Sequence, residues 1–375
     1  MKIGLITFHC ALNYGAILQT TALYTMLERL NSDTELINFR FPPVCSIVDH
    51  TRRMELKNPH NLLRFLVKGR TENKKKTCFD TFLLKHISNM SKECNTFQDL
   101  KLLYDANPYD VCVCGSDQVW NPYIIHFESA YFLRFADQRS KKISYAASIG
   151  QDTIGEDGIA FISDNITSID AISVREDSAV EILRRAGVTN PINVNLDPVF
   201  FLSKEQWHEK SLPVKIPHDI KKYIFVYRLT DNPVMDKVLQ EITQKTGLRC
   251  VAITDRLGKI PFITKKYMSV GPGEFLFLLE NAEYVVTDSF HGIAFSILFE
   301  KKLIAVSNLK RNTRILNILS KLDMRECLVN QSSDKDFIPN VDYSRKYKNC
   351  RRILQKEYKR NQEYLASEII GCKNN

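Results

Sequence analysis

Short runs of β-branched, aromatic and aliphatic residues alternate along the chain with longer segments in which apolar residues recur every three or four positions. The short runs predict buried strands, and the longer segments predict helices. In the first half, the predicted strands are Lys2–Phe8, Glu35–Phe39, Tyr109–Cys114, Lys142–Ala147 and Ala171–Val174, and the predicted helices are Ala16–Leu30, Ala160–Ile169 and Ser178–Ala186. Strands that alternate with helices favour a mostly parallel, doubly wound sheet.

A second series of the same kind follows a polar stretch at 203–222, which is predicted to link two domains. Its predicted strands are Tyr223–Tyr227, Arg249–Ile253, Tyr284–Val286 and Leu303–Val306, and its predicted helices are Pro233–Lys245, Gly273–Asn281 and Arg314–Leu322. Residues 345–370 predict a long terminal helix that folds back across both domains. The expected fold class is α/β, with two Rossmann-like doubly wound domains at 1–205 and 220–340 that face a cleft, and a C-terminal helix at 341–375.

Composition agrees with a soluble protein of two domains. The chain has 375 residues, of which 44% are hydrophobic and 25% charged, and no apolar run approaches the roughly 20 residues of a membrane span. The apolar start is interrupted by His9 and Asn13, so it does not predict a signal peptide. Ten cysteines lie scattered without a CxxC pair, so we expect reduced thiols, a cytoplasmic location and no metal site.

The net charge of +9 favours anionic partners, which could be nucleic acid, phosphorylated small molecules or an acidic membrane surface. Nucleic acid fits least, because the basic residues are dispersed and no DNA- or RNA-binding motif is present. Residues 42–100 form a basic, amphipathic insertion with helical spacing. It is either a solvated excursion packed on its domain or a peripheral contact with an anionic membrane, at residues 50–76, at the inner face of that membrane.

The stretch at 284–306 combines a strand pattern, a polar loop and a helix pattern. Asp288 and Ser289 break the strand with side chains that cap helices, and Gly292 permits a close backbone approach. His291 then falls at a helix N-terminus, where anions are attracted. The alternative is a core histidine satisfied by a hydrogen bond, but that residue would more often sit inside an element, so we interpret His291 as functional.

Other polar clusters also follow predicted strands, and ligands bind open α/β sheets at the carboxyl ends of strands. These clusters contain Asn13 and Gly15, then Asp117 with Gln118 and Trp120, then Arg175, and then Arg228. Two readings stay open for the charged members. Asp117 is either a functional carboxylate or a turn residue, and Arg175 is either functional or a surface ion pair with Glu176 or Asp177. The pattern predicts a cleft and leaves the reaction open.

The sequence resembles the polysaccharide pyruvyl transferase family over nearly its whole length. Six segments in order carry the resemblance: Asn13-Tyr14-Gly15-Ala16 with Leu18-Gln19, Gly115-Ser116-Asp117-Gln118-Val119-Trp120-Asn121, Tyr145-Ala146-Ala147-Ser148, Ser173-Val174-Arg175-Glu176, Leu196-Asp197-Pro198 and Thr287-Asp288-Ser289-Phe290-His291-Gly292. The resemblance implies a fold like that of GT-B glycosyltransferases. It also implies transfer of the enolpyruvyl carbons of phosphoenolpyruvate to a sugar, usually as a cyclic ketal, in the synthesis of bacterial capsular polysaccharide or exopolysaccharide.

The same resemblance implies roles for Arg175 and His291 in phosphoenolpyruvate binding and catalysis. Many members of the family have an arginine two residues before the histidine, where this chain has Ser289. A second phosphate-binding cation is therefore expected elsewhere. The candidates are Arg228, Lys310, Arg311 and Arg314.

The residue types suit this chemistry. Phosphoenolpyruvate carries a carboxylate and a phosphate, which a forked guanidinium and helix N-terminal N–H groups can bind. Ketal formation needs an acid to protonate the methylene carbon, for which His291 is the candidate, and a base, for which Asp117 or Asp288 is the candidate. Phosphoenolpyruvate is then a co-substrate, and no cofactor or metal is expected.

We therefore expect a cytoplasmic ketal pyruvyl transferase that acts on a lipid-linked or nucleotide-linked sugar of a polysaccharide precursor, with the acceptor on the N-terminal domain. One alternative is a GT-B glycosyltransferase that uses a nucleotide sugar. The other is a non-catalytic protein that binds sugar or phosphate. Phosphate release from phosphoenolpyruvate in the presence of acceptors would separate the three.

Overall fold

The computed structural model describes residues 1–31, 33–45, 59–255, 259–307, 313–330 and 337–371. Its residues cluster into two compact units. Unit 1 contains Met1–Leu66, Leu83–Phe201 and Lys356–Asn375, and unit 2 contains Val67–Phe82 and Leu202–Gln355. The boundary after Phe201 lies close to the predicted domain end at residue 205.

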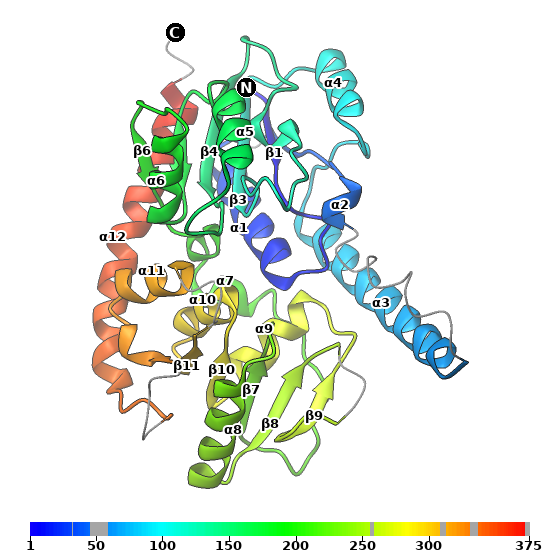
Figure 1. Cartoon of the computed structure of the whole chain (residues 1–375), viewed down its shortest axis with the longest axis vertical. Helices are drawn as coiled ribbons and strands as arrows, with labels where there is room; N and C mark the ends of the chain where they lie inside the picture. Colours follow the sequence, from blue (N-terminus) through cyan, green and yellow to red (C-terminus); the bar gives the residue numbers. More distant parts are fainter. Residues whose placement is uncertain (32, 46–58, 256–258, 308–312, 331–336, 372–375) are drawn as a thin grey trace. The chain divides into compact units, whose positions relative to one another are not determined.

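Unit 1 is built on a six-stranded sheet in the order β2-β1-β3-β4-β5-β6, in which every pairing is parallel (Figure 1). The strands are β1 (Ile3–Ile6), β2 (Thr34–Leu36), β3 (Val111–Asp117), β4 (Lys141–Ala147), β5 (Ile172–Val174) and β6 (Ile192–Val194). The other elements are α1 (Tyr14–Leu30), α2 (Pro42–Cys45), α4 (Phe97–Ala106), η2 (Ser129–Phe132), α5 (Glu156–Ile166), α6 (Asp177–Arg185) and η3 (Pro198–Phe201). Helix α3 (Pro59–His86) is divided between the units. The predicted doubly wound sheet is confirmed.

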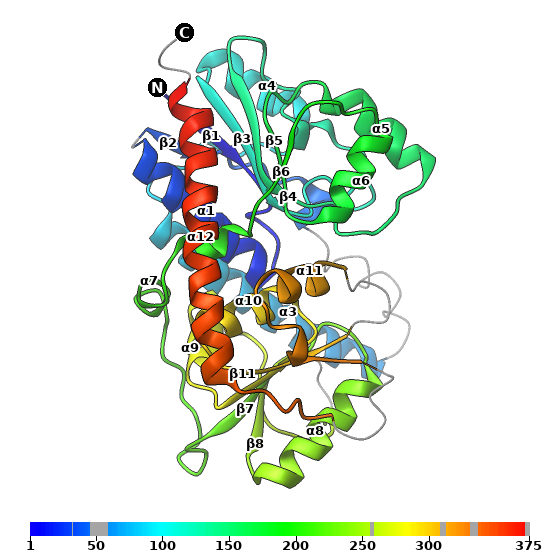
Figure 2. The same ribbon diagram turned by 90° about the vertical axis from the view of Figure 1, so that its left-hand side faces the viewer.

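Helices cover both faces of this sheet. On one face, α4, α5, α6 and η2 pack on the strands through a continuous cluster that includes Tyr104, Ile162 and Ile182. Helix α1 packs on the other face, and the C-terminal part of α12 (Tyr343–Ile370) runs along it, opposite α5 and α6 (Figure 2). The hydroxyl of Tyr364 on α12 donates to the carbonyl of Ser144 on β4 at 3.1 Å. The sheet is therefore buried on both sides, as parallel sheets require.

Unit 2 has a second parallel sheet in the order β12-β11-β10-β7-β8-β9. Its strands are β7 (Tyr223–Tyr227), β8 (Arg249–Ile253), β9 (Ile263–Tyr267), β10 (Tyr284–Thr287), β11 (Lys302–Val306) and β12 (Leu328–Val329). Its other elements are α7 (Lys204–His208), α8 (Pro233–Thr246), α9 (Pro272–Glu280), α10 (Phe290–Leu298), α11 (Thr313–Lys321) and η4 (Arg325–Cys327). Relabelled in chain order, this is the 3-2-1-4-5-6 order of dinucleotide-binding domains.

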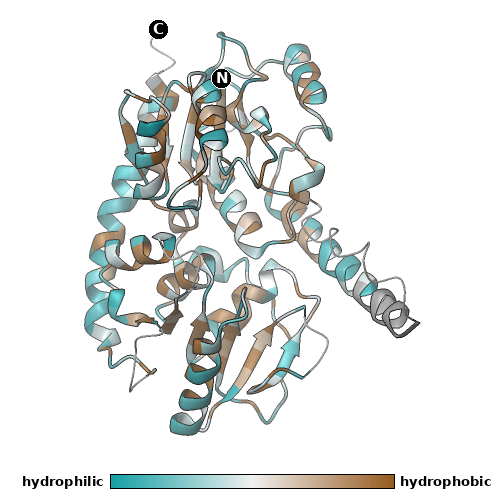
Figure 3. Cartoon of the chain, in the orientation of Figure 1, coloured by the Kyte–Doolittle hydropathy of each residue, from teal (hydrophilic) through white to brown (hydrophobic). Residues whose placement is uncertain are grey.

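The core of unit 2 also lies on both faces of its sheet. Val238 and Leu239 of α8 belong to an apolar cluster with β7, β8, β10 and β11. Aromatic rings fill the other face, where Phe275 of α9 packs edge-on against Tyr227 at 5.1 Å and Trp207 of α7 packs against Phe295 of α10 at 5.0 Å. Much of the sheet is accordingly brown in Figure 3, although β9 is partly teal, and the outer helix surfaces are largely teal.

Three expectations change on comparison with the structure. The polar stretch at 203–222 begins with α7, whose Trp207 is fully buried in unit 2, so this part is packed structure and not an open linker. Strands β6, β9 and β12 were not predicted. The expectation of reduced thiols is wrong for one pair, because Cys10 and Cys45 form a disulfide. The free thiols include Cys112, which is fully buried.

Within the described residues, no helix is long and apolar enough to span a bilayer. The same residues contain no group of three or more His, Cys, Asp or Glu side chains placed to hold a metal ion.

Candidate functional site

Both sheets have a switch point, where the chain changes the direction in which it adds strands, and such points form ligand-binding crevices at the carboxyl ends of the strands. In unit 1 the switch lies between β1 and β3, because β2 adds to one side of β1 and β3 to the other. In unit 2 it lies between β7 and β10. Asp117 is the last residue of β3, and His291 lies four residues after β10. Asp117 and His291 therefore fall at the switch points, whereas Arg175 follows β5, two strands from β3.

His291 is held in the first turn of α10 by a compact loop. Ser289 caps the helix, its hydroxyl accepting from the N–H of Gly292 at 3.3 Å. A Cβ at Gly292 would overlap Oγ1 of Thr287, whose hydroxyl donates to the carbonyl of Tyr227 at 2.7 Å. Gly292 therefore lets the helix start close against β10. The imidazole, 7% exposed and edge-on to Phe290, lies at the positive end of the α10 dipole.

Asp288 clamps the loop that follows β7. One carboxylate oxygen accepts from the N–H of Leu229 at 2.7 Å, and the other accepts from both the N–H and the hydroxyl of Thr230, at 3.0 and 2.6 Å. The side chain joins the two strands that flank the switch point of unit 2. Three donors already occupy this carboxylate, so the arrangement favours a positioning role over the predicted role of catalytic base.

Arg228, predicted to bind phosphate, stabilises the same loop. Its guanidinium pairs with Asp236 at 2.6 Å and donates to the carbonyls of Thr230 and Asn232 at 2.8 and 3.2 Å. These contacts occupy most of the N–H groups of the guanidinium, so few remain to bind a ligand. Lys310 and Arg311 lie outside the described residues, and Arg314 lies in the first turn of α11.

Arg175 lies inside unit 1 in a cluster with three carboxylates. Nη1 is 2.6 Å from Asp197, Nη2 is 3.7 Å from Asp117, and Nε is 3.8 Å from Glu176. Its side chain is only 2% exposed. The alternative that Arg175 forms an ion pair on the surface is therefore wrong, because its side chain is buried. Glu176 is nevertheless one of its partners.

This cluster places one positive charge among three negative charges. Burial by itself would lower the pKa of Arg175, but the carboxylates of Asp197, Asp117 and Glu176 outweigh burial and raise it, so the guanidinium stays charged. A site with an excess of carboxylates repels a phosphate and a carboxylate. The placement therefore favours Arg175 as the residue that holds the ends of β3, β5 and the loop after β6 together, and its role in phosphoenolpyruvate binding stays a prediction.

Asp117 adopts a left-handed backbone conformation, with φ of 65°. Non-glycine residues pay strain there, and such strain concentrates at functional sites. The Asp117 carboxylate accepts from the N–H of Gln118 at 2.9 Å, and its carbonyl accepts from the N–H of Ser148 at 2.9 Å. Gln118 packs against Gly150, where a Cβ would overlap its amide. These contacts fix the carboxylate of Asp117 at the switch point.

Glu176 was not among the predicted site residues. One of its carboxylate oxygens accepts three bonds, from the hydroxyl of Ser148 at 2.9 Å and from the N–H groups of Ile149 and Gly150 at 2.8 and 2.9 Å. It thereby anchors the loop after β4. A signal was present, because Glu176 directly follows a predicted strand beside Arg175.

Trp120 and Asn13 were predicted to bind substrate. Trp120 is fully buried, donates from its indole to the carbonyl of Tyr131 at 3.1 Å and stacks on Phe132, which favours a packing role. Asn13 is exposed and caps α1, its side-chain oxygen accepting from the N–H of Gly15 at 2.9 Å. Asn13 and Gly15 therefore shape the start of α1 at the unit 1 switch point, where anions bind helix N-termini.

Two solved structures with a similar fold are distant in sequence. The UDP-GlcNAc 2-epimerase from Neisseria meningitidis bound to UDP-GlcNAc is 11% identical, with 99% of this chain and 100% of that chain covered and a TM-score of 0.51. The UDP-GlcNAc 2-epimerase from Methanocaldococcus jannaschii is 12% identical, with 95% and 100% covered and a TM-score of 0.50. Such identities show the fold alone, which is of the GT-B type, with two Rossmann-like sheets.

Comparison with curated proteins finds no match. Comparison with protein families does. The family described as polysaccharide pyruvyl transferase matches residues 13–310, a span that begins at the cap of α1 and includes Asp117, Arg175 and His291. Because the match covers more than half of the sequence and both switch points, this chain belongs to the polysaccharide pyruvyl transferase family.

Proposed function

We propose that the protein transfers the enolpyruvyl group of phosphoenolpyruvate to a sugar of a polysaccharide precursor, with formation of a pyruvate ketal and release of phosphate. The observation that carries the proposal is His291 in the first turn of α10, at the switch point of unit 2, within a chain of this family. An imidazole at that position lies beside N–H groups that bind phosphate.

In the proposed reaction, His291 gives its proton to the methylene carbon of phosphoenolpyruvate, which becomes a methyl group. A sugar hydroxyl attacks the adjacent carbon and forms the first C–O bond. A second hydroxyl then forms the other C–O bond while the bond from carbon to the phosphate oxygen breaks, and phosphate leaves with the electron pair. A base takes the proton of the first hydroxyl, and the departing phosphate takes the proton of the second. Asp117 stays the candidate base, because three donors occupy Asp288.

The acceptor is a lipid-linked or nucleotide-linked sugar. A nucleotide-linked sugar is supported by the shared GT-B fold of the UDP-GlcNAc 2-epimerases, one of which is bound to UDP-GlcNAc. The reaction needs phosphoenolpyruvate, a cytoplasmic metabolite, so we place the enzyme in the cytoplasm.

The test is to incubate the protein with phosphoenolpyruvate and candidate acceptors in D₂O. The expected products are phosphate and a pyruvylated sugar with deuterium in the methyl group. Release of a nucleoside diphosphate from a nucleotide sugar, without consumption of phosphoenolpyruvate, would instead identify a glycosyltransferase.

His291 is tested by two substitutions and a matched control. His291→Ala should lower turnover by about 10²–10⁴-fold, the usual range for a positioned general acid. His291→Gln can donate a hydrogen bond but no titratable proton, so it should keep part of the binding and lose turnover. His208→Gln is the control, because His208 is an exposed histidine of unit 2 whose partner is Glu280 of α9. Near wild-type turnover of His291→Gln, with deuterium still incorporated, would place the acid elsewhere.

A further inference from the structure

Helix α12 carries much of the positive charge of the protein. Its 28 residues contain eight Lys and Arg and three Glu, which leaves it at +5 in a chain of +9. Figure 3 shows the helix teal over much of its length. Carboxylates elsewhere in the protein neutralise some of these charges.

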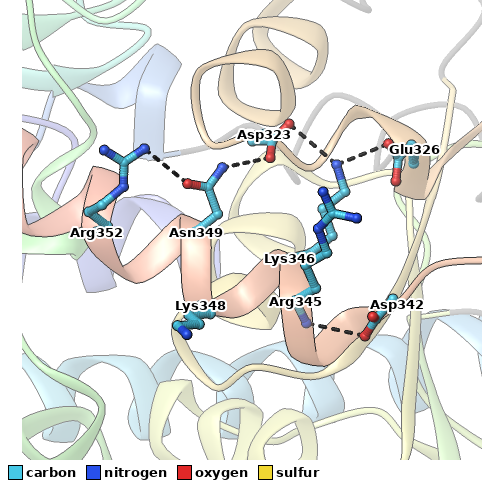
Figure 4. Close-up of a pocket in the computed structure, with 8 residues that line it drawn as sticks. All are labelled: Asp323, Glu326, Asp342, Arg345, Lys346, Lys348, Asn349 and Arg352. Atoms are coloured by element: carbon cyan, nitrogen blue, oxygen red, sulfur yellow. Dashed lines mark hydrogen bonds and ion pairs between the residues drawn. The ribbon is translucent and has the colours of Figure 1, made fainter.

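The eight cations fall into two groups, and those of the first group pair with carboxylates. Lys346 lies 3.3 Å from Asp323 and 2.9 Å from Glu326. Figure 4 shows both pairs. The other two members of this group are Arg351, which is 2.6 Å from Glu300, and Arg360, which is 2.7 Å from Glu357. These three charges are therefore compensated within the protein.

The second group consists of Arg345, Lys348, Arg352, Lys356 and Lys359, which we call the α12 stripe. All five are exposed. At 100° per residue they fall within an arc of about 80°, and at 1.5 Å per residue they extend over about 21 Å. Among the described residues, the first four make no ion pair with a carboxylate, and Lys359 has only a long one, 3.8 Å from Glu363.

The part of the stripe in unit 2 borders a surface pocket lined by Asp323, Glu326, Asp342, Arg345, Lys346, Lys348, Asn349 and Arg352 (Figure 4). Of the acidic side chains of this pocket, Asp323 accepts from Lys346 and Asn349, and Glu326 pairs with Lys346. Asp342 accepts from the backbone N–H of Arg345. The side chain of Arg352 contacts only the amide oxygen of Asn349 within this pocket, at 3.1 Å. The pocket therefore presents uncompensated guanidinium groups to the solvent.

We propose that the α12 stripe docks the protein on the surface of an anionic phospholipid bilayer. A straight row of cations on one side of a helix meets many headgroups at once, and each Lys or Arg near such a surface strengthens binding about fivefold. Nucleic acid fits less well, because single strands need aromatic side chains for stacking. The four tyrosines of α12 lie on the opposite side, where Tyr347 and Tyr364 are buried.

The predicted docking by the insertion at 42–100 is a separate hypothesis with a different surface. Arg52 and Arg53 lie outside the described residues. Of the lysines in α3, Lys75 is 3.1 Å from Asp255 and Lys76 is 2.6 Å from Asp80. Two lysines of the insertion are therefore compensated within the protein.

The experiment is sedimentation of the full chain with vesicles of phosphatidylglycerol and phosphatidylcholine, and with vesicles of phosphatidylcholine alone. The wild type should bind the anionic vesicles at low salt and be released at high salt. Replacing all five residues of the stripe with Gln should weaken binding about 10³-fold, and Arg345→Gln/Lys348→Gln should weaken it about 30-fold. Gln keeps a high helix propensity, and the double variant tests the proposal if the fivefold variant does not fold.

The matched control removes the same number of charges from scattered exposed lysines, and it should bind within about threefold of the wild type if the stripe carries the docking. The control positions are Lys85, Lys92, Lys204, Lys215 and Lys221. Equal losses in the stripe and control variants, wild-type binding by the stripe variant, or no binding of the wild type to anionic vesicles would overturn the proposal. Tighter binding to a DNA duplex than to the vesicles, lost with the stripe, would overturn it in favour of nucleic acid. Pyruvyl transfer to a soluble acceptor is measured separately, so failure of docking and failure of the proposed function are distinguishable.

Discussion

The sequence predicts that Arg175 binds phosphoenolpyruvate, and the structure favours a role in holding unit 1 together. Removal of Arg175 distinguishes these two roles. The guanidinium is the only cation among the buried carboxylates of Asp117, Glu176 and Asp197 that the structure describes in this cluster. Arg175→Ala would leave three negative charges together in unit 1. Loss of one partner from a buried ion pair costs about 3–5 kcal/mol, because the remaining charges are left uncompensated.

That cost is measurable as a shift in the unfolding temperature. For a unit of about two hundred residues, 1 kcal/mol corresponds to roughly 2–4 °C, so the unfolding temperature of unit 1 should fall by about 6–20 °C. The chain contains two tryptophans, Trp120 in unit 1 and Trp207 in unit 2. In a Trp207→Phe background, the fluorescence of Trp120 therefore reports the unfolding of unit 1 alone.

A surface pair provides the control. Arg185 lies 2.7 Å from Glu156, and both side chains are largely exposed, so Arg185→Ala should change stability by less than about 1 kcal/mol. Arg175→Lys keeps the charge but loses the fork, so it should restore part of the stability. If Arg175→Ala unfolded at the wild-type temperature while its affinity for phosphoenolpyruvate fell by about 2–4 kcal/mol, the guanidinium would be a ligand group and the structural argument would be refuted.

Three further predictions concern single sites. Gly292→Ala should destabilise unit 2 by about 1–3 kcal/mol and lower turnover, measured by thermal unfolding and phosphate release, because its Cβ would displace Thr287; unchanged values would contradict the tight approach of α10 to β10. The hydrogen bond from Lys302 lowers the pKa of Glu283, so this pair stabilises the folded protein fully at pH values above the ordinary carboxyl pKa of about 4.3. The stabilisation is lost as the pH falls through the lowered pKa of Glu283. Lys302→Met should therefore weaken the loss of stability with falling pH in a plot of the free energy of unfolding against pH, and an unchanged plot would refute this. Burial raises the pKa of Cys112 to about 12, so this thiol should resist alkylation at pH 8 in the native protein, as peptide mass spectrometry would show.

The sequence was a reliable guide where local pattern determines structure. Tyr223–Tyr227 and Arg249–Ile253 were predicted with the bounds that β7 and β8 have, because continuous apolar runs are typical of strands buried on both faces. The position of His291 after a capping serine was also confirmed. Strand β9 was missed because Lys265 and Lys266 interrupt its apolar pattern at the edge of the sheet.

Side-chain partners far apart in the chain were not predictable in the same way. The pairing of Arg175 with Asp197 depends on the order of β4, β5 and β6 in the sheet, which periodicity does not specify. Asp288 was predicted to be a base because its residue type suits that role, yet its partners come from a loop 58 and 59 residues away. The disulfide between Cys10 and Cys45 has no spacing signature, so only the fold reveals it.

The division of α12 between the units has a consequence for protein production. Residues 356–370 follow the whole of unit 2 in the chain, yet they belong to unit 1, where Tyr364 bonds to β4. During synthesis, unit 2 can therefore complete its fold before unit 1, although unit 1 supplies the first strand. A fragment that ends at residue 201 would leave one face of β4 exposed to water, and for expression of unit 1 alone, residues 356–371 would have to be supplied, for example through a designed connection.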